Sequence, residues 1–600
     1  MSTSERRVPV RRYVDLISGY LRGRRGQFAA LGFFICAGIG LQLMIPQITR
    51  RFIDMAEAGA LPRTLVSVAV AFIGASLVQQ VVTVLGRYLG EHLAWSATND
   101  MRIDLARHAL RLDMRYHNDK TPGEMIERVD GDLLKISEFF SQLVVMVVGS
   151  LLLLVGILVA LFLEDARLGG IFVLFAGGTI ALFVKLRNIA VPWDKELRDR
   201  ISDMFGFIEE RLAGTEDIRS SGAVDFVLTG LHKAHYGLFK PWRTARLLQV
   251  VIRLAAGITM VLGYAIAFVA GYHLHRTGAL TIGAVYLIVH YTEILGRPIR
   301  MLVQQVQNLQ EIGANVQRVT ELFAEESGIA DSEGQADAIF PAGGSVPSPS
   351  APALPASVSF DDVRFGYNPE EPVLHGVSFE VRPNTTLGVL GRTGSGKTTL
   401  ARLIFRLYDP QAGSVRLDGA DVRGYPLSHL RGRVAMVTQD VQIFQATVRQ
   451  NLTFFDTSVS DERLHEVIGE LGLAEWLASL PEGLDSKVEQ GGRGLSAGQA
   501  QLLAFTRVFL KDPGLVILDE ASSRLDPATE ALIERVVDRL LVNRSAIVIA
   551  HRLPTVHRAD DILIMDDGRV AEFGNRRALE SDVGSRFRRL LETGLEDVLV

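Results

Sequence analysis

The stretch Gly391-Arg392-Thr393-Gly394-Ser395-Gly396-Lys397-Thr398 decides the fold of the second half of this chain. It follows the apolar run 386–390 and leads into residues 399–404, which have the composition of a helix. The pattern G-x-x-x-x-G-K-[ST] between a strand and a helix is typical of a P-loop, whose glycines let backbone N–H groups face a triphosphate. We expect Lys397 to contact the β- and γ-phosphates and the Thr398 hydroxyl to ligate Mg²⁺. The alternative is a glycine-rich turn that binds no ligand. That alternative has to be considered when no other motif of a nucleotide site accompanies the pattern.

A second predicted strand, residues 515–520, is apolar and ends in Asp519 and Glu520. Such a run is typical of a buried parallel strand. A carboxylate at the tip of such a strand in a P-loop fold is the usual second Mg²⁺ anchor, and Asp519 takes that position. Glu520 can accept a proton from the attacking water, which makes it the candidate general base. The alternative is a strand followed by a polar turn, which is common in α/β domains.

The order of the remaining motifs resembles the nucleotide-binding domain of ABC transporters. After the P-loop come Gln439 within Val-Thr-Gln-Asp, Leu-Ser-Ala-Gly-Gln at 495–499, the Asp-Glu strand, Ser-Arg-Leu-Asp at 523–526, and His551. Tyr367 lies upstream, where this family places an aromatic ring under the adenine. The resemblance covers residues 358–587 and implies an α/β P-loop ATPase.

The resemblance also implies roles for single residues, and an ATP site that two chains share. The loop at 495–499 precedes a predicted helix, whose N-terminus suits phosphate, and in the family it serves the ATP held by the partner's P-loop. Gln439 is expected to sense Mg²⁺ and the attacking water, and His551 to bind the γ-phosphate. The expected catalytic residues are Glu520, His551 and Gln439; the metal ligands are Thr398, Gln439 and Asp519; the ATP-binding residues are Tyr367, Gly391, Arg392, Thr393, Gly394, Ser395, Gly396, Lys397, Thr398, Thr399, Ser496, Ala497, Gly498, Gln499 and Asp526.

Two positions depart from the family pattern. Ala497 stands where the signature loop usually has glycine, and Arg524 stands where alanine is common. A methyl group at residue 497 is tolerable if the backbone there is helical. The two departures favour a heterodimer with a second, related half-transporter over a homodimer, and both arrangements stay open.

The first half of the chain predicts a membrane domain. The apolar residues of this 600-residue, 48% hydrophobic chain are concentrated before residue 305. Three runs of more than twenty residues carry no charge, which is long enough to cross a bilayer as a helix; buried helices of a soluble core are the alternative. The predicted spans are 27–49, 64–86, 139–163, 168–187, 250–273 and 277–302, within a transmembrane domain at 27–323; residues 1–26 precede it, and a Pro-, Ala- and Ser-rich flexible linker, 324–357, separates it from the ATPase domain at 358–600.

Arginine placement predicts the orientation of these spans. The chain is expected in the inner membrane of the cell. Its N-terminal segment is rich in arginine and is therefore expected on the cytoplasmic side. Six membrane crossings return the ATPase domain to that same side. Arg50, Arg51 and Arg63 near the first outer loop oppose this bias. Cys36 is the single cysteine, so an intrachain disulfide is excluded. The cytoplasmic arginines are Arg6, Arg7, Arg11, Arg12, Arg22, Arg24 and Arg25.

Long polar stretches at 87–138 and 185–253 have helical patterning and resemble the intracellular loops of ABC exporters. Within them, coupling helices are expected near 126–135 and 220–228. His290, Glu293 and Arg297 recur at helical spacing in the sixth span, where they either line a substrate path or form a salt bridge.

Together these features predict a six-helix all-α transmembrane domain with long intracellular extensions, followed by the ATPase domain. The expected function is ATP-driven export by one half of a dimeric transporter. The cargo stays open among small molecules such as drugs, lipids and peptides. The alternative function is an ATP-gated channel or sensor on the same scaffold. The sequence has no basic patch with interleaved aromatics, so nucleic acid is not an expected partner.

Overall fold

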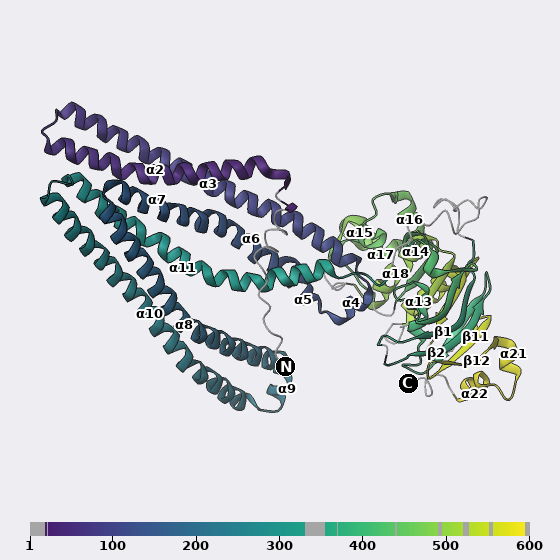
Figure 1. Cartoon of the computed structure of the whole chain (residues 1–600). Helices are drawn as coiled ribbons and strands as arrows, with labels where there is room; N and C mark the ends of the chain where they lie inside the picture. Colours follow the sequence, from purple (N-terminus) through teal and green to yellow (C-terminus); the bar gives the residue numbers. More distant parts are fainter. Residues whose placement is uncertain are drawn as a thin grey trace. The chain divides into compact units, whose positions relative to one another are not determined.

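The structure is a computed structural model that describes residues 19–20, 22–329, 354–368, 370–438, 441–489, 495–519, 527–550 and 556–593 (Figure 1). The chain divides into two compact units. Met1–Leu110 and Thr121–Glu325 form the first, and Arg111–Lys120 and Glu326–Val600 form the second. Each unit is described here by itself.

The first unit is helical. Among the residues that the structure describes, five helices are long and apolar enough to cross a membrane: Arg22–Glu57, Pro62–Arg111, Met146–Glu164, Ala166–Ala213 and Val224–Arg276. The elements of this unit are η1 (Arg22–Arg24), α2 (Arg25–Glu57), α3 (Pro62–Arg111), α5 (Pro122–Ile126), the π-helical turn η2 (Glu127–Gly131), α6 (Asp132–Gln142), the π-helical turn η3 (Leu143–Val148), α7 (Gly149–Glu164), α8 (Ala166–Ala213), α9 (Thr215–Ser220), α10 (Val224–Arg276) and α11 (Ile282–Ala324).

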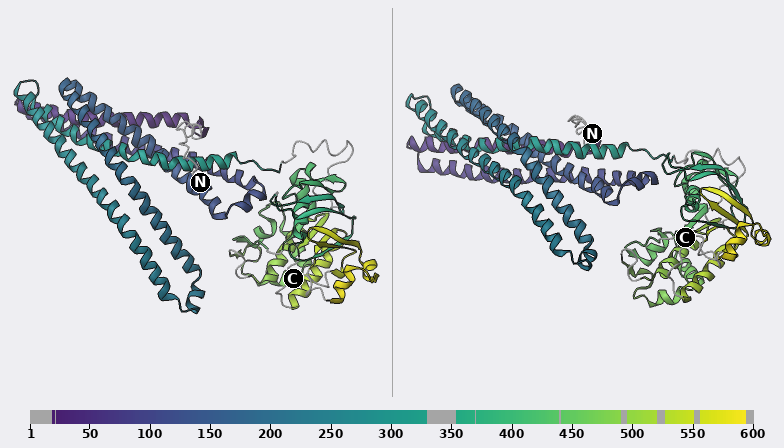
Figure 2. Two further views of the ribbon diagram at one scale, coloured as in Figure 1. Left: turned by 60° about the horizontal axis from the view of Figure 1, so that its bottom comes forward. Right: turned by 90° about the horizontal axis from the view of Figure 1, so that it is seen from below.

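Three of these helices are much longer than a bilayer requires. α3, α8 and α10 have 50, 48 and 53 residues. At about 1.5 Å per residue each exceeds about 70 Å, more than twice the ~30 Å hydrocarbon core. Figures 1 and 2 show α8 and α10 side by side, with α9 joining them at one end. The predicted fold class, a helical membrane domain with long helical extensions, is therefore confirmed.

The predicted boundaries need two corrections. The sixth span was expected to start at residue 277, but α11 begins at Ile282. Gly278 has a φ of 76°, which ends α10, and the Thr281 hydroxyl caps α11 by accepting a hydrogen bond from Ala284 N at 3.1 Å. The second coupling helix was expected near 220–228. The structure instead has α9 at Thr215–Ser220 and a turn before α10 begins at Val224.

A polar cluster joins α2, α7 and α11 near the turn between α2 and α3. Arg50 forms ion pairs with Glu164 and, at 3.6 Å, with Asp54. Asp54 also accepts a hydrogen bond from the backbone N of Gly283 at 2.9 Å. A Cβ on Gly283 would lie 2.5 Å from the Arg50 carbonyl, so glycine permits this approach. Arg50, which opposed the arginine bias used for orientation, is thus neutralised by two carboxylates.

A buried ion pair joins the other end of α11 to α6. Asp132 is fully buried, and its two oxygens accept hydrogen bonds from Arg318 Nε at 2.8 Å and Nη2 at 2.5 Å. Arg318 also donates to the side chain of Asn315 at 2.7 Å. The Arg318 side chain keeps 37% of its exposure, whereas Asp132 has none. If the ion pair is broken, water can therefore solvate the Arg318 guanidinium, whereas it cannot reach the buried Asp132 carboxylate.

The second unit is built around a six-stranded sheet with the order β12-β11-β3-β10-β9-β6, in which only β12 is antiparallel to its neighbour. An antiparallel sheet, β2-β1-β4-β5, and a small pair, β7-β8, accompany it. The strands are β1 (Val358–Phe365), β2 (Leu374–Val381), β3 (Thr386–Gly391), β4 (Ala412–Leu417), β5 (Ala420–Asp421), β6 (Val434–Val437), β7 (Ala446–Thr447), β8 (Lys487–Val488), β9 (Leu515–Asp519), β10 (Ser545–Ile549), β11 (Asp561–Asp566) and β12 (Arg569–Asn575).

Helices cover both faces of the six-stranded sheet, which is why β3 and β10 are buried along their whole length. The helices of this unit are α4 (Met114–Asp119), α13 (Lys397–Ile404), α14 (Leu427–Arg433), α15 (Val448–Thr453), α16 (Asp461–Glu470), α17 (Ala474–Ser479), α18 (Ala497–Lys511), α19 (Pro527–Leu541), α21 (Arg576–Ser581) and α22 (Arg586–Thr593), with short 3₁₀ turns η4 (Val422–Gly424) and η5 (Gly483–Asp485).

Helices α13 and α18 lie on opposite faces of that sheet. Ile547 and Ile549 of β10 belong to the hydrophobic cluster that contains α13. Ala546 and Val548 belong to the cluster that contains α18. Because successive residues of a strand point to opposite faces, the two helices are on opposite sides of β10.

The asymmetry of the Asp132–Arg318 pair gives a testable prediction. Arg318→Ala should cost about 3–5 kcal/mol of stability, because it leaves a fully buried carboxylate without a partner. Asp132→Ala should cost less, because the half-exposed guanidinium can turn to water. Thermal unfolding of the detergent-purified chain measures both changes, with Arg24→Ala, which breaks the exposed pair with Asp100, as the matched control. A larger loss for Asp132→Ala than for Arg318→Ala would contradict this account.

Candidate functional site: a phosphate loop and its neighbours

The phosphate loop connects β3 to α13 through two glycines that no larger residue could replace. Gly391 ends β3 with a φ of 149°, and a Cβ there would lie 2.3 Å from the Met565 carbonyl. Gly396 precedes α13 with a φ of 100°, and its Cβ would lie 2.6 Å from a Leu374 methyl group. The loop between them thus packs closely on β11 and β2 and presents the N-terminus of α13.

Two buried polar side chains in this loop suit an anion. Lys397 is 6% exposed, and its ammonium donates hydrogen bonds to the carbonyls of Gly391 and Arg392 at 2.5 and 2.8 Å. Burial lowers the pKa of Lys397, and the negative charge of Asp519 raises it. The buried Ser395 hydroxyl has no hydrogen-bond partner within the described part of the chain. Phosphate oxygens would accept from both groups and add the negative charge that Lys397 favours.

The two predicted metal ligands with described positions lie together. Thr398, in the first turn of α13, has its hydroxyl 3.3 Å from Asp519 Oδ2 at the end of β9. β10 lies between β3 and β9, so both ligands reach the same edge of the sheet. A hydroxyl and a carboxylate oxygen are hard ligands of the kind that Mg²⁺ prefers.

Tyr367 is tied to α13 by its hydroxyl. That oxygen lies 3.1 Å from the Thr399 hydroxyl and accepts a hydrogen bond from Arg402 Nη1 at 2.8 Å. The Arg402 guanidinium also lies 5.5 Å from the centre of the Tyr367 ring. The aromatic residue expected at the adenine is therefore connected to the helix that begins at the phosphate loop.

The loop at 495–499 forms a second helix N-terminus. The Ser496 hydroxyl accepts from Gln499 N at 3.2 Å, and Gln499 Oε1 accepts from Ser496 N at 2.9 Å, which is a capping box. Ala497 is the first residue of α18 and is exposed, so its methyl group fits the helical backbone as expected, while Gly498 is buried. Because α18 and α13 cover opposite faces of the sheet, this N-terminus and the phosphate loop are separate parts of the unit.

Four predicted site residues, Gln439, Glu520, Asp526 and His551, lie outside the described residues. The described residues that precede three of them are at the carboxyl ends of neighbouring parallel strands. Thr438 follows β6, Asp519 ends β9 and Ala550 follows β10. This is the edge of the sheet that also carries the phosphate loop.

One segment of the first polar stretch belongs to the ATPase unit. A coupling helix was expected near 126–135, whereas the structure assigns Arg111–Lys120, with α4, to the second unit. Asp113 caps α4 through Tyr116 N at 3.1 Å, and its other oxygen accepts from Gly328 N at 2.8 Å. Asn118 Nδ2 donates to the Tyr408 hydroxyl at 2.6 Å. The Asp113 cap and Pro122 after Thr121 are the sequence signals that could have located this short helix.

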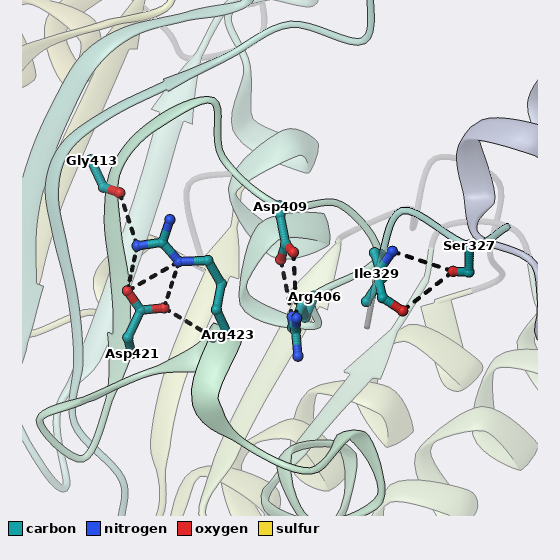
Figure 3. A network of polar contacts seen from close by, with 7 residues as sticks. All are labelled: Ser327, Ile329, Arg406, Asp409, Gly413, Asp421 and Arg423. Carbon is teal, nitrogen blue, oxygen red and sulfur yellow. Dashed lines mark hydrogen bonds and ion pairs between the residues drawn. The ribbon is translucent and has the colours of Figure 1, made fainter. Parts of the chain in front are cut away.

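Tyr408 connects α4 to the phosphate-loop region. Its ring packs edge-on against Tyr367, with centroids 5.2 Å apart, and at 5.6 Å against Phe365. Burial raises the pKa of Tyr408, so its hydroxyl stays protonated and neutral at physiological pH. The buried Arg406 braces this turn by pairing with Asp409 at 3.0 Å (Figure 3). Contacts thus run from Asn118 through Tyr408 and Tyr367 to α13.

Family models match both halves of the chain. The model described as "ABC transporter transmembrane region" matches residues 28–299, and the model described as "ABC transporter" matches residues 374–523. The second match includes the phosphate loop, the helix N-terminus at Ser496 and Asp519.

Individual proteins match over nearly the whole chain. An ATP-dependent lipid A-core flippase of Chromobacterium violaceum is 30% identical, covering 91% of this chain and 91% of its own. An uncharacterized ABC transporter ATP-binding protein of Bacillus subtilis is 29% identical, covering 93% of this chain and 91% of its own. The solved structure of a bacterial Atm1-family ABC exporter with ATP bound has the same fold, with a TM-score of 0.75, 24% identity, and coverage of 95% of this chain and 98% of that one.

The Asn118–Tyr408 hydrogen bond yields a prediction about communication between α4 and the nucleotide. Tyr408→Phe keeps the ring packed on Tyr367 but removes the acceptor for Asn118, a loss of about 0.5–1.5 kcal/mol. We expect ATP affinity to stay within about twofold, while stimulation of ATP turnover by transported compounds falls. The matched control is Tyr425→Phe, which removes a buried hydroxyl that donates instead to Leu417 O, at the end of β4, at 2.8 Å.

A double-mutant cycle with Asn118→Ala isolates this contact. The account is contradicted if the Tyr408→Phe and Tyr425→Phe variants respond alike, or if the effects of Asn118→Ala and Tyr408→Phe add without coupling.

Proposed function

Because the chain belongs to the ABC transporter superfamily, as an exporter-type half-transporter with a transmembrane region fused to an ATPase domain, we propose that it exports its cargo by alternating access as one half of a dimer. It is a multi-pass membrane protein and an ATPase coupled to transport. The observation that carries the proposal is the placement of α13 and α18 on opposite faces of one sheet. Each chain then supplies the phosphate loop of one ATP site and, with the N-terminus of α18, the opposite side of a second ATP site.

The proposed chemistry assigns one task to each group at the phosphate loop. Lys397, the Ser395 hydroxyl and the N-terminus of α13 bind the phosphates of ATP. Thr398 and Asp519 would hold Mg²⁺, which when bound neutralises charge on the β- and γ-phosphates. Glu520 takes a proton from the attacking water, and closing of the site by a second chain excludes bulk water.

ATP bound between two chains would draw the two ATPase units together. Two helix N-termini, one from each chain, then face the same triphosphate, and each adds its partial positive charge. The two helix N-termini no longer stabilise the charge of the γ-phosphate once it has left. Hydrolysis therefore lets the two ATPase units separate. The α4 segment, which contacts Tyr408, would transmit this change to the membrane helices.

We further propose six membrane spans, the cytoplasmic placement of the N-terminus and ATPase domain, and insertion in the inner membrane. The arginine-rich segment before residue 26 supports this orientation, as does the pairing of Arg50 with carboxylates. Among the cargo classes, small-molecule, lipid or peptide-like, the similarity to a lipid A-core flippase favours a lipid-like compound. For the partner chain, Arg524 and Ala497 favour a related half-transporter over an identical copy.

Replacing the general base tests the ATPase mechanism. Glu520→Gln keeps the shape of the side chain but cannot take a proton, so hydrolysis should fall about 10²–10⁴-fold while Mg·ATP binding persists. Retained nucleotide in the purified variant measures this directly. Lys397→Ala is the control, because it should lose ATP binding itself. Wild-type turnover in the Glu520→Gln variant, or loss of its nucleotide binding, would exclude Glu520 as the base.

Replacing the cap of α18 tests the sharing of the site. Ser496→Arg puts a bulky cation where the partner's ATP is expected, so it should stop hydrolysis at the site whose phosphate loop belongs to the partner. Ser460→Arg is the control, because Ser460 caps α16 in the same unit and either change removes one cap, about 1 kcal/mol. Photoreactive ATP followed by chain-specific detection distinguishes the two sites. Unchanged hydrolysis at both sites in the Ser496→Arg variant would disprove the shared site.

A further inference from the structure

A cavity of about 490 Å³ lies among α8, α10 and α11 and is lined by four arginines. Arg187 comes from α8, Arg253 from α10, and Arg297 and Arg300 from α11. The other lining residues are apolar, and no acidic residue lines the cavity. A volume of this size is typical of sites for small molecules.

These four arginines lack the carboxylate partners that two other arginines of this unit have; Arg187 is partly buried and the other three are exposed. Arg50 is paired with Glu164 and Asp54, and Arg318 with Asp132. Within the described part of the chain, no carboxylate forms an ion pair with any of the four, and Arg187 Nε is buried without a partner. Guanidinium groups stay charged at all physiological pH values. Four of them around one cavity therefore favour an anion that the chain does not supply.

The cavity lies where apolar helix segments meet polar ones. Arg187 follows the uncharged segment 168–184 of α8, and Arg253 precedes the uncharged segment 254–272 of α10. α8 and α10 run side by side in opposite directions (Figure 2), and Arg187 and Arg253 line the same cavity between them. Phe183 and Ile252 add apolar walls beside them. The cavity thus places positively charged arginine side chains beside apolar side chains.

Arg297 also lines a second, larger cavity of about 980 Å³, together with Gln42 and Gln79 of α2 and α3. Met301 is shared by both cavities as well. A compound bound to the four arginines would therefore touch the wall of the larger cavity. Arginines that merely extend to the lipid phosphates at a helix end need not line one cavity from three helices, as these four do.

We propose that this cavity binds an anionic amphiphile, a molecule with a phosphate or carboxylate head and a hydrocarbon tail. The arginines bind the head through charge-assisted hydrogen bonds, and Phe183 and Ile252 contact the tail. The assignment rests on the proposed export function for its biological meaning, since the amphiphile is either the cargo or a lipid of the surrounding bilayer. The binding itself needs neither ATP nor a working ATPase.

Two matched ligands test the proposal on the full-length purified chain without ATP. Palmitoyl lysophosphatidic acid and monopalmitoylglycerol share the tail and differ in the phosphate. We expect the wild-type chain to bind the phosphate compound at least about tenfold more tightly, and the double variant Arg187→Ala/Arg253→Ala to lose this difference. Arg187→Lys/Arg253→Lys keeps both charges and should restore much of it.

The control is Arg200→Ala/Arg243→Ala, which removes the same charges from exposed positions of the same two helices outside the cavity. It should bind like the wild type. Equal affinity of the wild-type chain for both ligands would overturn the proposal, whatever the variants do. So would unchanged binding of the phosphate compound by a monodisperse Arg187→Ala/Arg253→Ala variant.

Proteoliposomes distinguish the two sources of the amphiphile. ATP-dependent movement of the labelled phosphate compound between leaflets identifies cargo. Stimulation of ATP turnover by anionic lipid without such movement identifies a bilayer lipid, and either result supports the site. If the compound does not move and anionic lipid does not stimulate ATP turnover, while the phosphate-selective binding persists, the proposed export function loses its support and the binding site remains.

Discussion

A triphosphate held between two protein chains has its charge met from more than one side, and in the proposed function each chain meets it from one side. The N-terminus of α13 and the phosphate loop lie on one face of the six-stranded sheet, whereas the N-terminus of α18 lies on the other. The alternating direction of the side chains of β10 produces this separation, because consecutive side chains of a strand point to opposite faces. In the proposed function a complete ATP site therefore includes a second chain, and ATP is the ligand that joins the two chains.

The ATPase unit includes one segment of the first half of the chain. α4 belongs to the ATPase unit although its neighbours in the sequence belong to the helical one. Its Asn118 donates to Tyr408, and Tyr408 packs on Tyr367, which is hydrogen-bonded to α13. The buried Arg406–Asp409 pair holds the turn that presents Tyr408. Within the ATPase unit, α4 is thus connected to the helix that begins at the phosphate loop through a few packed contacts.

Short sequence motifs predicted those parts of the ATP site whose residues lie close together in the sequence. The glycines of the phosphate loop, Lys397 and Thr398 lie within eight residues of one another, and Asp519 ends an apolar strand. Both parts of the site could therefore be recognised without knowledge of the packing. The helix of Met114–Asp119 was missed, because six residues are too short for a hydrophobic period. The start of α11 was misplaced, because the cap at Thr281 interrupts an apolar run that has no charge. The four arginines around one cavity come from three helices, and only tertiary packing brings them together.

The central claim, that each chain supplies half of every ATP site, can be tested by crosslinking from Ala497. This residue is exposed in the first turn of α18, so a short diazirine-bearing amino acid fits there. In a Glu520→Gln background with Mg·ATP, irradiation is predicted to give an adduct with the mass of two chains, and its peptide should contain the phosphate loop of the second chain, whether an identical copy or a related half-transporter. An adduct confined to one chain, or one that forms equally without ATP, would contradict the account.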